Sequence, residues 1–156
     1  MTKISTNDIG KFVALGVSYK SHQDEKDVAY RWPDLWVVPD EGVIAEGETI
    51  RIPDWVEDIK PGAELTAVIG EDIWNASESE AWDAIKGFTI SNDVSVAGQW
   101  PGWSDPDAET VSGIGYKLLP TFSPILTEYT EKQDKSAYDD LLVEVDVDGK
   151  SAVSGS

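Results

Sequence analysis

The sequence predicts a mostly β protein with short helices, an α+β fold built as one domain over residues 1–156. Short runs of β-prone residues recur along the chain between turn signals, which is typical of strands. An apolar repeat at helical spacing occurs clearly in only one short stretch. A chain of 156 residues is also long enough to bury a sizeable core. Together these observations predict a mixed, curled sheet with one short helix.

The predicted strands follow the alternation of apolar and polar residues. The clearest run begins at Leu141 and is followed by the hairpin signal Asp148–Gly149. Two prolines predict irregular or edge structure for Tyr116–Ile125, and the polar segment Glu128–Asp140 is predicted to be a surface connection. The expected strands are Phe12–Tyr19, Leu35–Val38, Glu64–Ile69, Phe88–Asn92 and Leu141–Val147.

The one predicted helix covers Glu78–Lys86. Ser77 can cap its first turn, and Glu80 stands at the spacing that completes a capping box. Gly87 follows the last helical residue, where a glycine commonly closes a helix in a left-handed conformation. We therefore expect the helix to end at Gly87 and the next strand to begin at Phe88.

Composition restricts the classes of partner and compartment. The chain carries 30 acidic and 12 basic residues, a net charge of -18, which argues against nucleic-acid binding because phosphate needs a basic surface. The acidic residues are spread along the chain, as in halophilic proteins; the alternative is an ordinary acidic cytoplasmic protein. The chain has no cysteine, so it has no disulfide or thiolate chemistry. No apolar run approaches a membrane span and no signal-peptide pattern is present, so we expect a cytoplasmic protein.

Four stretches in order resemble the fumarylacetoacetate hydrolase family, which includes 2-hydroxyhepta-2,4-diene-1,7-dioate isomerases and acylpyruvate hydrolases. The segment GFTISNDVSVAGQ is similar to the family's "GYTvgNDvSaRDlQ" signature. The resemblance extends over about Phe12 to Lys150 and rests also on ALGVSYKSHQDE (Ala14–Glu25), AELTAVIG (Ala63–Gly70) and GYKLLPTFSPI (Gly115–Ile125).

The resemblance implies the mixed β-sandwich roll of that family, incomplete at its C-terminal end. In the family, several further strands follow the hairpin signal at Asp148–Gly149, whereas this sequence continues for only a few residues. We therefore expect either a fragment of a longer protein or a shortened homologue that buries its strand edge in another way. An unpaired strand edge favours association, and a homodimer is among the expectations.

The resemblance also implies a divalent metal site. Family members hold magnesium or manganese with two carboxylates two residues apart on one strand and the aspartate of the "ND" signature. Glu64 matches the second strand carboxylate and Asp93 the third, while Gly62 stands at the first position. We therefore expect weak binding of Mg²⁺ or Mn²⁺, because ligand charge largely sets affinity for a hard cation. On this reasoning Gly62→Glu should strengthen the site.

The remaining site residues are also implied by the resemblance. His22 and Glu25 match the family's acid–base pair, and Lys117 matches the lysine that stabilises negative charge developing on the substrate. Tyr19, which precedes the histidine, and Gln99, which remains where the family's arginine is lost, are the expected substrate-binding residues.

The expected function is that of a divalent-metal-dependent enzyme acting on a 2-keto or β-diketo carboxylic acid. The reaction would be C–C bond cleavage or a related decarboxylation, isomerisation or hydration. Departures from the family pattern at Gly62, Val38 and Ala97 favour one alternative, a catalytically impaired, shortened homologue that keeps the fold. A second alternative is a β-rich binding module, for which Trp100 and Trp103 would form an aromatic platform.

Acidity of the halophilic kind predicts a salt response. Mutual repulsion among exposed carboxylates destabilises the folded chain at low ionic strength, and salt screens that repulsion. The melting temperature should therefore rise between dilute buffer and molar KCl, as measured by circular dichroism. A melting temperature that stays flat or falls over this range would contradict the halophilic interpretation.

Overall fold

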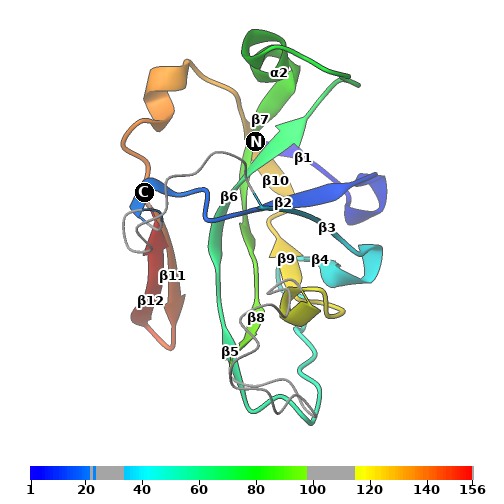
Figure 1. The fold of residues 1–156 in the computed structure, drawn as a ribbon, viewed down its shortest axis with the longest axis vertical. Helices are drawn as coiled ribbons and strands as arrows, with labels where there is room; N and C mark the ends of the chain where they lie inside the picture. The colour runs from blue at the N-terminus through cyan, green and yellow to red at the C-terminus, as the bar shows by residue number, and fades with distance from the viewer. Residues whose placement is uncertain (22, 24–33, 98–114, 156) are drawn as a thin grey trace.

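The structure, a computed structural model, describes residues 1–21, 23, 34–97 and 115–155. Three residues expected in the site, His22, Glu25 and Gln99, lie outside this part. Within it, the chain is mostly β, with the helix α2 (Glu78–Ala84) at one end of a long ribbon (Figure 1). In the described residues we find no helix with the length and apolar character needed to cross a membrane.

The main sheet of the described chain has six strands and mixed directions. Its order is β1-β10-β7-β9-β4, with β6 paired to β7. The β4–β9 pairing is parallel and the others are antiparallel. The strands are β1 (Thr2–Lys3), β4 (Val43–Ala45), β6 (Ala63–Ile69), β7 (Ile85–Asn92), β9 (Ser123–Ile125) and β10 (Glu128–Glu131).

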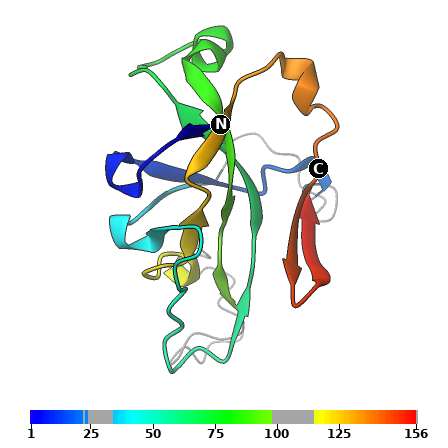
Figure 2. The same ribbon diagram turned by 180° about the vertical axis from the view of Figure 1, so that it is seen from behind.

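Three two-stranded antiparallel sheets complete the described strands. The C-terminal hairpin stands beside the main sheet, and Figures 1 and 2 show it so from both sides. The pairs are β2 (Phe12–Gly16) with β3 (Asp34–Val38), β5 (Asp58–Lys60) with β8 (Ser95–Ala97), and β11 (Val143–Val147) with β12 (Lys150–Gly155).

The β5–β8 pair continues the β6–β7 ladder in the same register. Lys60 lies opposite Ser95, and Ala63 lies opposite Asn92. The ladder is interrupted between these pairs because the Gly62 N–H donates to the Asn92 side chain, so the pair formed by residues 62 and 93 keeps only the bond from the Asp93 N–H to the Gly62 carbonyl oxygen. We call this interruption, residues 61–62 facing residues 93–94, the ladder break. It is the feature of the fold that positions the site.

The core lies directly beside the ladder break. Val94, Val96 and Phe122 form a buried cluster, and the partly buried residues around it are Ile50, Val56, Ile59 and Leu119. The Val94 N–H points to the opposite edge of its strand from the Asp93 N–H and donates to the Phe122 carbonyl oxygen at 2.9 Å. Burying Val94 and Phe122 therefore fixes the backbone on which Asp93 stands.

Several elements expected from the sequence are confirmed. The mainly β fold and the strands near Leu35–Val38 and Glu64–Ile69 are present, as β3 and β6. The Ser77–Glu80 capping box is formed at the start of α2. The β11–β12 hairpin turns at Asp148 and Gly149, both with positive φ, because such a two-residue turn requires left-handed backbone at both positions.

The prediction that Gly87 closes the helix in a left-handed conformation is wrong. The helix ends at Ala84, and Gly87 is a buried residue inside β7. Its φ is not positive, and a Cβ placed on it would lie 2.2 Å from the Thr130 carbonyl oxygen of β10. The glycine is needed because β10 approaches β7 closely at this residue.

Three other sequence expectations need correction. Glu128–Asp140, predicted as a surface connection, begins with β10, which pairs with β1 and β7. Within Tyr116–Ile125, β9 lies inside the sheet between β7 and β4. The strand predicted for Phe12–Tyr19 ends at Gly16, because Val17 adopts φ 51°, which extended structure cannot accommodate.

The corrected role of Gly87 gives a testable prediction. Gly87→Ala should lower the free energy of unfolding by about 1–3 kcal/mol or more, because the new methyl group must displace the β10 backbone. Urea denaturation measures the change. Gly10→Ala is the matched control, since a Cβ at Gly10 meets nothing within 4 Å. Equal stabilities of the two variants would contradict the close-packing interpretation.

Candidate active site

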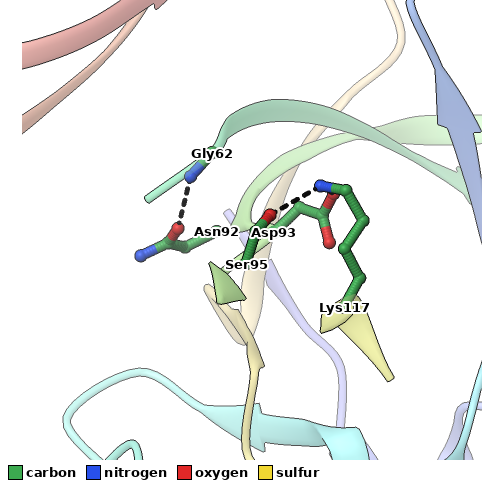
Figure 3. Close-up of polar contacts among 5 residues, drawn as sticks. All are labelled: Gly62, Asn92, Asp93, Ser95 and Lys117. Atoms are coloured by element: carbon green, nitrogen blue, oxygen red, sulfur yellow. Dashed lines mark hydrogen bonds and ion pairs between the residues drawn. The ribbon is translucent and has the colours of Figure 1, made fainter. Parts of the chain in front are cut away.

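Asp93 is held at the ladder break by backbone contacts on both strands. Its N–H donates to the Gly62 carbonyl oxygen at 2.9 Å. The neighbouring Asn92 side chain accepts from the Gly62 N–H, also at 2.9 Å (Figure 3). With Val94 buried on the other side, three consecutive residues, 92–94, are anchored, and the Asp93 side chain is only 12% exposed.

Lys117 brings an ammonium group to this carboxylate from a distant part of the chain. It ends the 3₁₀ helix η3 (Gly115–Lys117), and its Nζ lies 2.5 Å from Asp93 Oδ2. The same Nζ donates to Ser95 Oγ at 2.8 Å, as Figure 3 shows. It also lies 5.6 Å from the centre of the Trp36 ring, within the range of a cation–π interaction. The ammonium thus joins β3, β8 and the ladder break.

Glu64 is the second carboxylate of the site. Gly62 stands opposite Asp93 and Glu64 opposite Ser91, so Glu64 and Asp93 are diagonal neighbours on one face of the ribbon. Burial, together with the Asp93 charge, raises the pKa of Glu64 to about 7. Lys117 and a hydrogen bond from Tyr19 act in the opposite direction.

Tyr19 supports Glu64 from the segment after β2. Its hydroxyl oxygen accepts the Leu65 N–H at 2.7 Å, which leaves the hydroxyl proton for the Glu64 carboxylate. Burial raises the pKa of Tyr19, and the adjacent Glu64 charge raises it as well. The geometry places Tyr19 as a residue that orients Glu64. Its expected contact with substrate stays a prediction.

The space at Gly62 argues against restoring a carboxylate there. A Cβ on Gly62 would lie 2.6 Å from the Asp93 carbonyl oxygen and 3.3 Å from Asp93 Cβ. Gly62→Glu would therefore move the backbone that holds Asp93 before it could add a ligand. We no longer expect this substitution to strengthen a metal site.

The described residues offer an open site for a hard cation. They contain no cluster of three or more histidine, cysteine, aspartate or glutamate residues able to hold a metal. Two carboxylates on one face, Glu64 and Asp93, fit Mg²⁺ or Mn²⁺ only if water or substrate supplies the remaining oxygens, which magnesium sites often allow. Lys117 already contacts one of these two carboxylates.

Of the residues predicted from the sequence, the structure brings together Glu64, Asp93, Lys117 and Tyr19. His22, Glu25 and Gln99 lie outside the described residues, so their roles stay predictions. Sequence reasoning missed Ser95 and Trp36 as contacts of the lysine. Strand alternation could have indicated Ser95, since it lies two residues after Asp93 and shares its face, but no sequence signal places Trp36 beside Lys117.

Comparison with known proteins identifies the family. Residues 11–156 match the family described as "Fumarylacetoacetate (FAA) hydrolase C-terminal". A fumarylacetoacetate hydrolase domain-containing protein 2 homolog of Dictyostelium discoideum is 33% identical over 117 residues, which are 74% of this chain and 37% of the relative. A caffeoylpyruvate hydrolase of Neonothopanus nambi is 36% identical over 98 residues, 59% of this chain and 34% of that protein.

Solved structures show the same fold. The crystal structure of a 5-carboxymethyl-2-hydroxymuconate delta-isomerase from Mycobacterium smegmatis superposes with a TM-score of 0.70 at 25% identity. The match includes 93% of this chain and 52% of the isomerase. The chain thus spans about half, or less, of the length of these relatives.

The raised pKa of Glu64 predicts how stability depends on pH. The folded chain holds the Glu64 proton up to about pH 7, whereas the unfolded chain releases it near 4.5. Glu64 therefore stabilises the folded chain at low pH, and this stabilisation is lost as the pH rises from 4.5 through about 7. In metal-free buffer, the stability of Glu64→Gln relative to wild type should rise by about 2–3 kcal/mol between pH 5 and 8.

Urea denaturation at each pH measures this difference. The control is Glu144→Gln, because Glu144 is an exposed glutamate on β11. Its stability relative to wild type should stay constant over the same range. A constant difference for Glu64→Gln as well would show that Glu64 is not held in a buried, proton-retaining environment.

Proposed function

Because the chain belongs to the fumarylacetoacetate hydrolase family, we propose that it forms the catalytic site of a divalent-metal-dependent enzyme acting on a 2-keto or β-diketo carboxylic acid. The reaction is C–C bond cleavage or a related isomerisation or decarboxylation. Two relatives support the substrate class by their names, one a caffeoylpyruvate hydrolase and the other a 5-carboxymethyl-2-hydroxymuconate delta-isomerase.

The observation that carries the proposal is the half-buried charge cluster at the ladder break. An ammonium 22% exposed and a carboxylate 12% exposed lie 2.5 Å apart, with Glu64 on the same face. Charges withdrawn from water are costly unless they are paired. Two carboxylates and one ammonium suit an anionic ligand once a divalent cation is bound, because the cation offsets the carboxylates and the ammonium can contact the negative oxygen atoms of the ligand.

The residues have distinct roles in this proposal. Lys117 stabilises negative charge that develops on the keto or enolate oxygen of the substrate. Ser95 and Trp36 orient the lysine, and Tyr19 orients Glu64. His22 and Glu25 move the proton, as the sequence predicts.

Glu64 and Asp93 would hold the divalent cation, with substrate oxygens completing its ligands. When bound, such an ion supplies Lewis-acid polarisation of the substrate's oxygen atoms. As expected from the sequence, the proposed ion is Mg²⁺ or Mn²⁺, and the affinity of the site for it is weak.

We also propose, as expected from the sequence, that the protein is cytoplasmic and forms a homodimer. Exposed aliphatic side chains on the outer face of β2–β3 offer a surface that pairing of two copies could bury: Val13, Leu15, Leu35 and Val37.

Turnover assays test this function. The chain should convert oxaloacetate or an acylpyruvate in the presence of Mg²⁺ or Mn²⁺, and a chelator should stop the reaction. Lys117→Met should lower kcat by about 10²–10³-fold, the usual effect of removing one group that stabilises developing negative charge. Absorbance of the enol or diketo form follows the reaction continuously.

Lys60→Met is the matched control. Lys60 is exposed on β5 and lies opposite Ser95, so its loss changes the net charge equally without removing a contact to Asp93. Its kcat should stay within about twofold of wild type. Absence of turnover with every keto acid and both ions would favour the alternative of a catalytically impaired homologue.

A further inference from the structure

The Lys117 ammonium occupies the Asp93 carboxylate closely. It contacts Asp93 Oδ2 at 2.5 Å and Ser95 Oγ at 2.8 Å, which uses two of its three N–H donors. Its remaining side faces the Trp36 ring. A lysine held from three directions is a fixed part of the ligand-free site.

This arrangement determines how much negative charge a cation would meet. Above about pH 7, where Glu64 is ionised, Glu64 and Asp93 supply two negative charges, but the ammonium cancels one of them, so the ligand-free site carries a single net negative charge. Moving the ammonium away would double the charge facing a divalent ion. Because charge count sets the affinity of hard cations, the lysine opposes cation binding at this site.

We propose that the Lys117 ammonium and a divalent cation compete for the Asp93 carboxylate, and that a keto acid relieves the competition by drawing the ammonium onto its own anionic oxygens. This inference rests on the proposed function, since it assumes a keto-acid ligand at the same cluster. The cation and the keto acid then bind with positive coupling: each raises the affinity of the other by the same factor. Because of the lysine, the site binds the cation more tightly when the keto acid is present than when the cation is alone.

The competition explains why two carboxylates suffice. A keto acid brings one negative charge and two oxygen atoms that can contact the cation. The Lys117 ammonium moves from Asp93 to the anionic oxygens of the keto acid. Asp93 is then free for the cation, while the anchored backbone at residues 92–94 keeps the carboxylate in place. The loss of a ligand at Gly62 is thus compensated by the substrate, whose binding is made conditional on the metal.

Titration of Mn²⁺ into the full chain tests the competition, with the free ion followed by electron paramagnetic resonance. Without keto acid, Lys117→Met should bind Mn²⁺ at least about tenfold more tightly than wild type, because a positive charge beside Asp93 is gone. In wild type, saturating pyruvate should tighten Mn²⁺ binding at least about tenfold. In Lys117→Met the same pyruvate should tighten it several-fold less than in wild type, because only the direct ligation of the ion by pyruvate remains.

Controls separate the possible outcomes. The Mn²⁺ affinity of Lys60→Met should match that of wild type within about twofold, which would show that the change in net charge alone is not responsible. Asp93→Asn should abolish Mn²⁺ binding. Equal Mn²⁺ affinity of wild type and Lys117→Met would overturn the competition while leaving the proposed function standing. Absence of Mn²⁺ binding in every variant, with and without pyruvate, would overturn the proposed function and the competition together. Should Lys117→Met fail to fold, the Mn²⁺ affinity of Lys117→Gln and the effect of pyruvate on Mn²⁺ binding in wild type test the competition in the same way.

Discussion

The ladder break is the constraint on which the rest of the structure depends. At this point the pair formed by residues 62 and 93 keeps only one of its two backbone bonds, because the Gly62 N–H donates to the Asn92 side chain. On the other edge of the strand, the Val94 N–H donates to the Phe122 carbonyl oxygen, and Val94 and Phe122 are buried in the core. The residue between the ladder and the core is Asp93. Its carboxylate is therefore held on a backbone fixed from both sides.

Charge pairing follows from that placement. A carboxylate on a half-buried face needs compensation, and the chain provides it from residue 117 rather than from a neighbouring strand position. Glu64, on the same face, has no partner of equal strength, so burial and the Asp93 charge shift its pKa towards neutrality. One cluster thus contains a carboxylate paired with an ammonium and a second carboxylate whose pKa is raised.

The β2–β3 hairpin connects the site to the N-terminal part of the chain. Trp36 reaches the lysine from β3, and the segment after β2 brings the Tyr19 hydroxyl to Leu65 and Glu64. The hairpin's other face remains apolar and exposed. The site therefore draws on five separated parts of the sequence, at residues 19, 36, 64, 93–95 and 117.

The sequence by itself determined the class of fold, most of the strands, the capped start of α2 and the β11–β12 turn. These features depend on local alternation, capping and turn chemistry, which neighbouring residues specify. It also indicated Glu64, Asp93 and Lys117, through their resemblance to a family. Only the tertiary structure decided that Gly87 serves strand packing, that residues 128–131 join the sheet, and that Trp36 lies beside the lysine. Each of these features depends on contacts between residues distant in sequence. Local sequence patterns do not specify which distant residue will lie next to a given position.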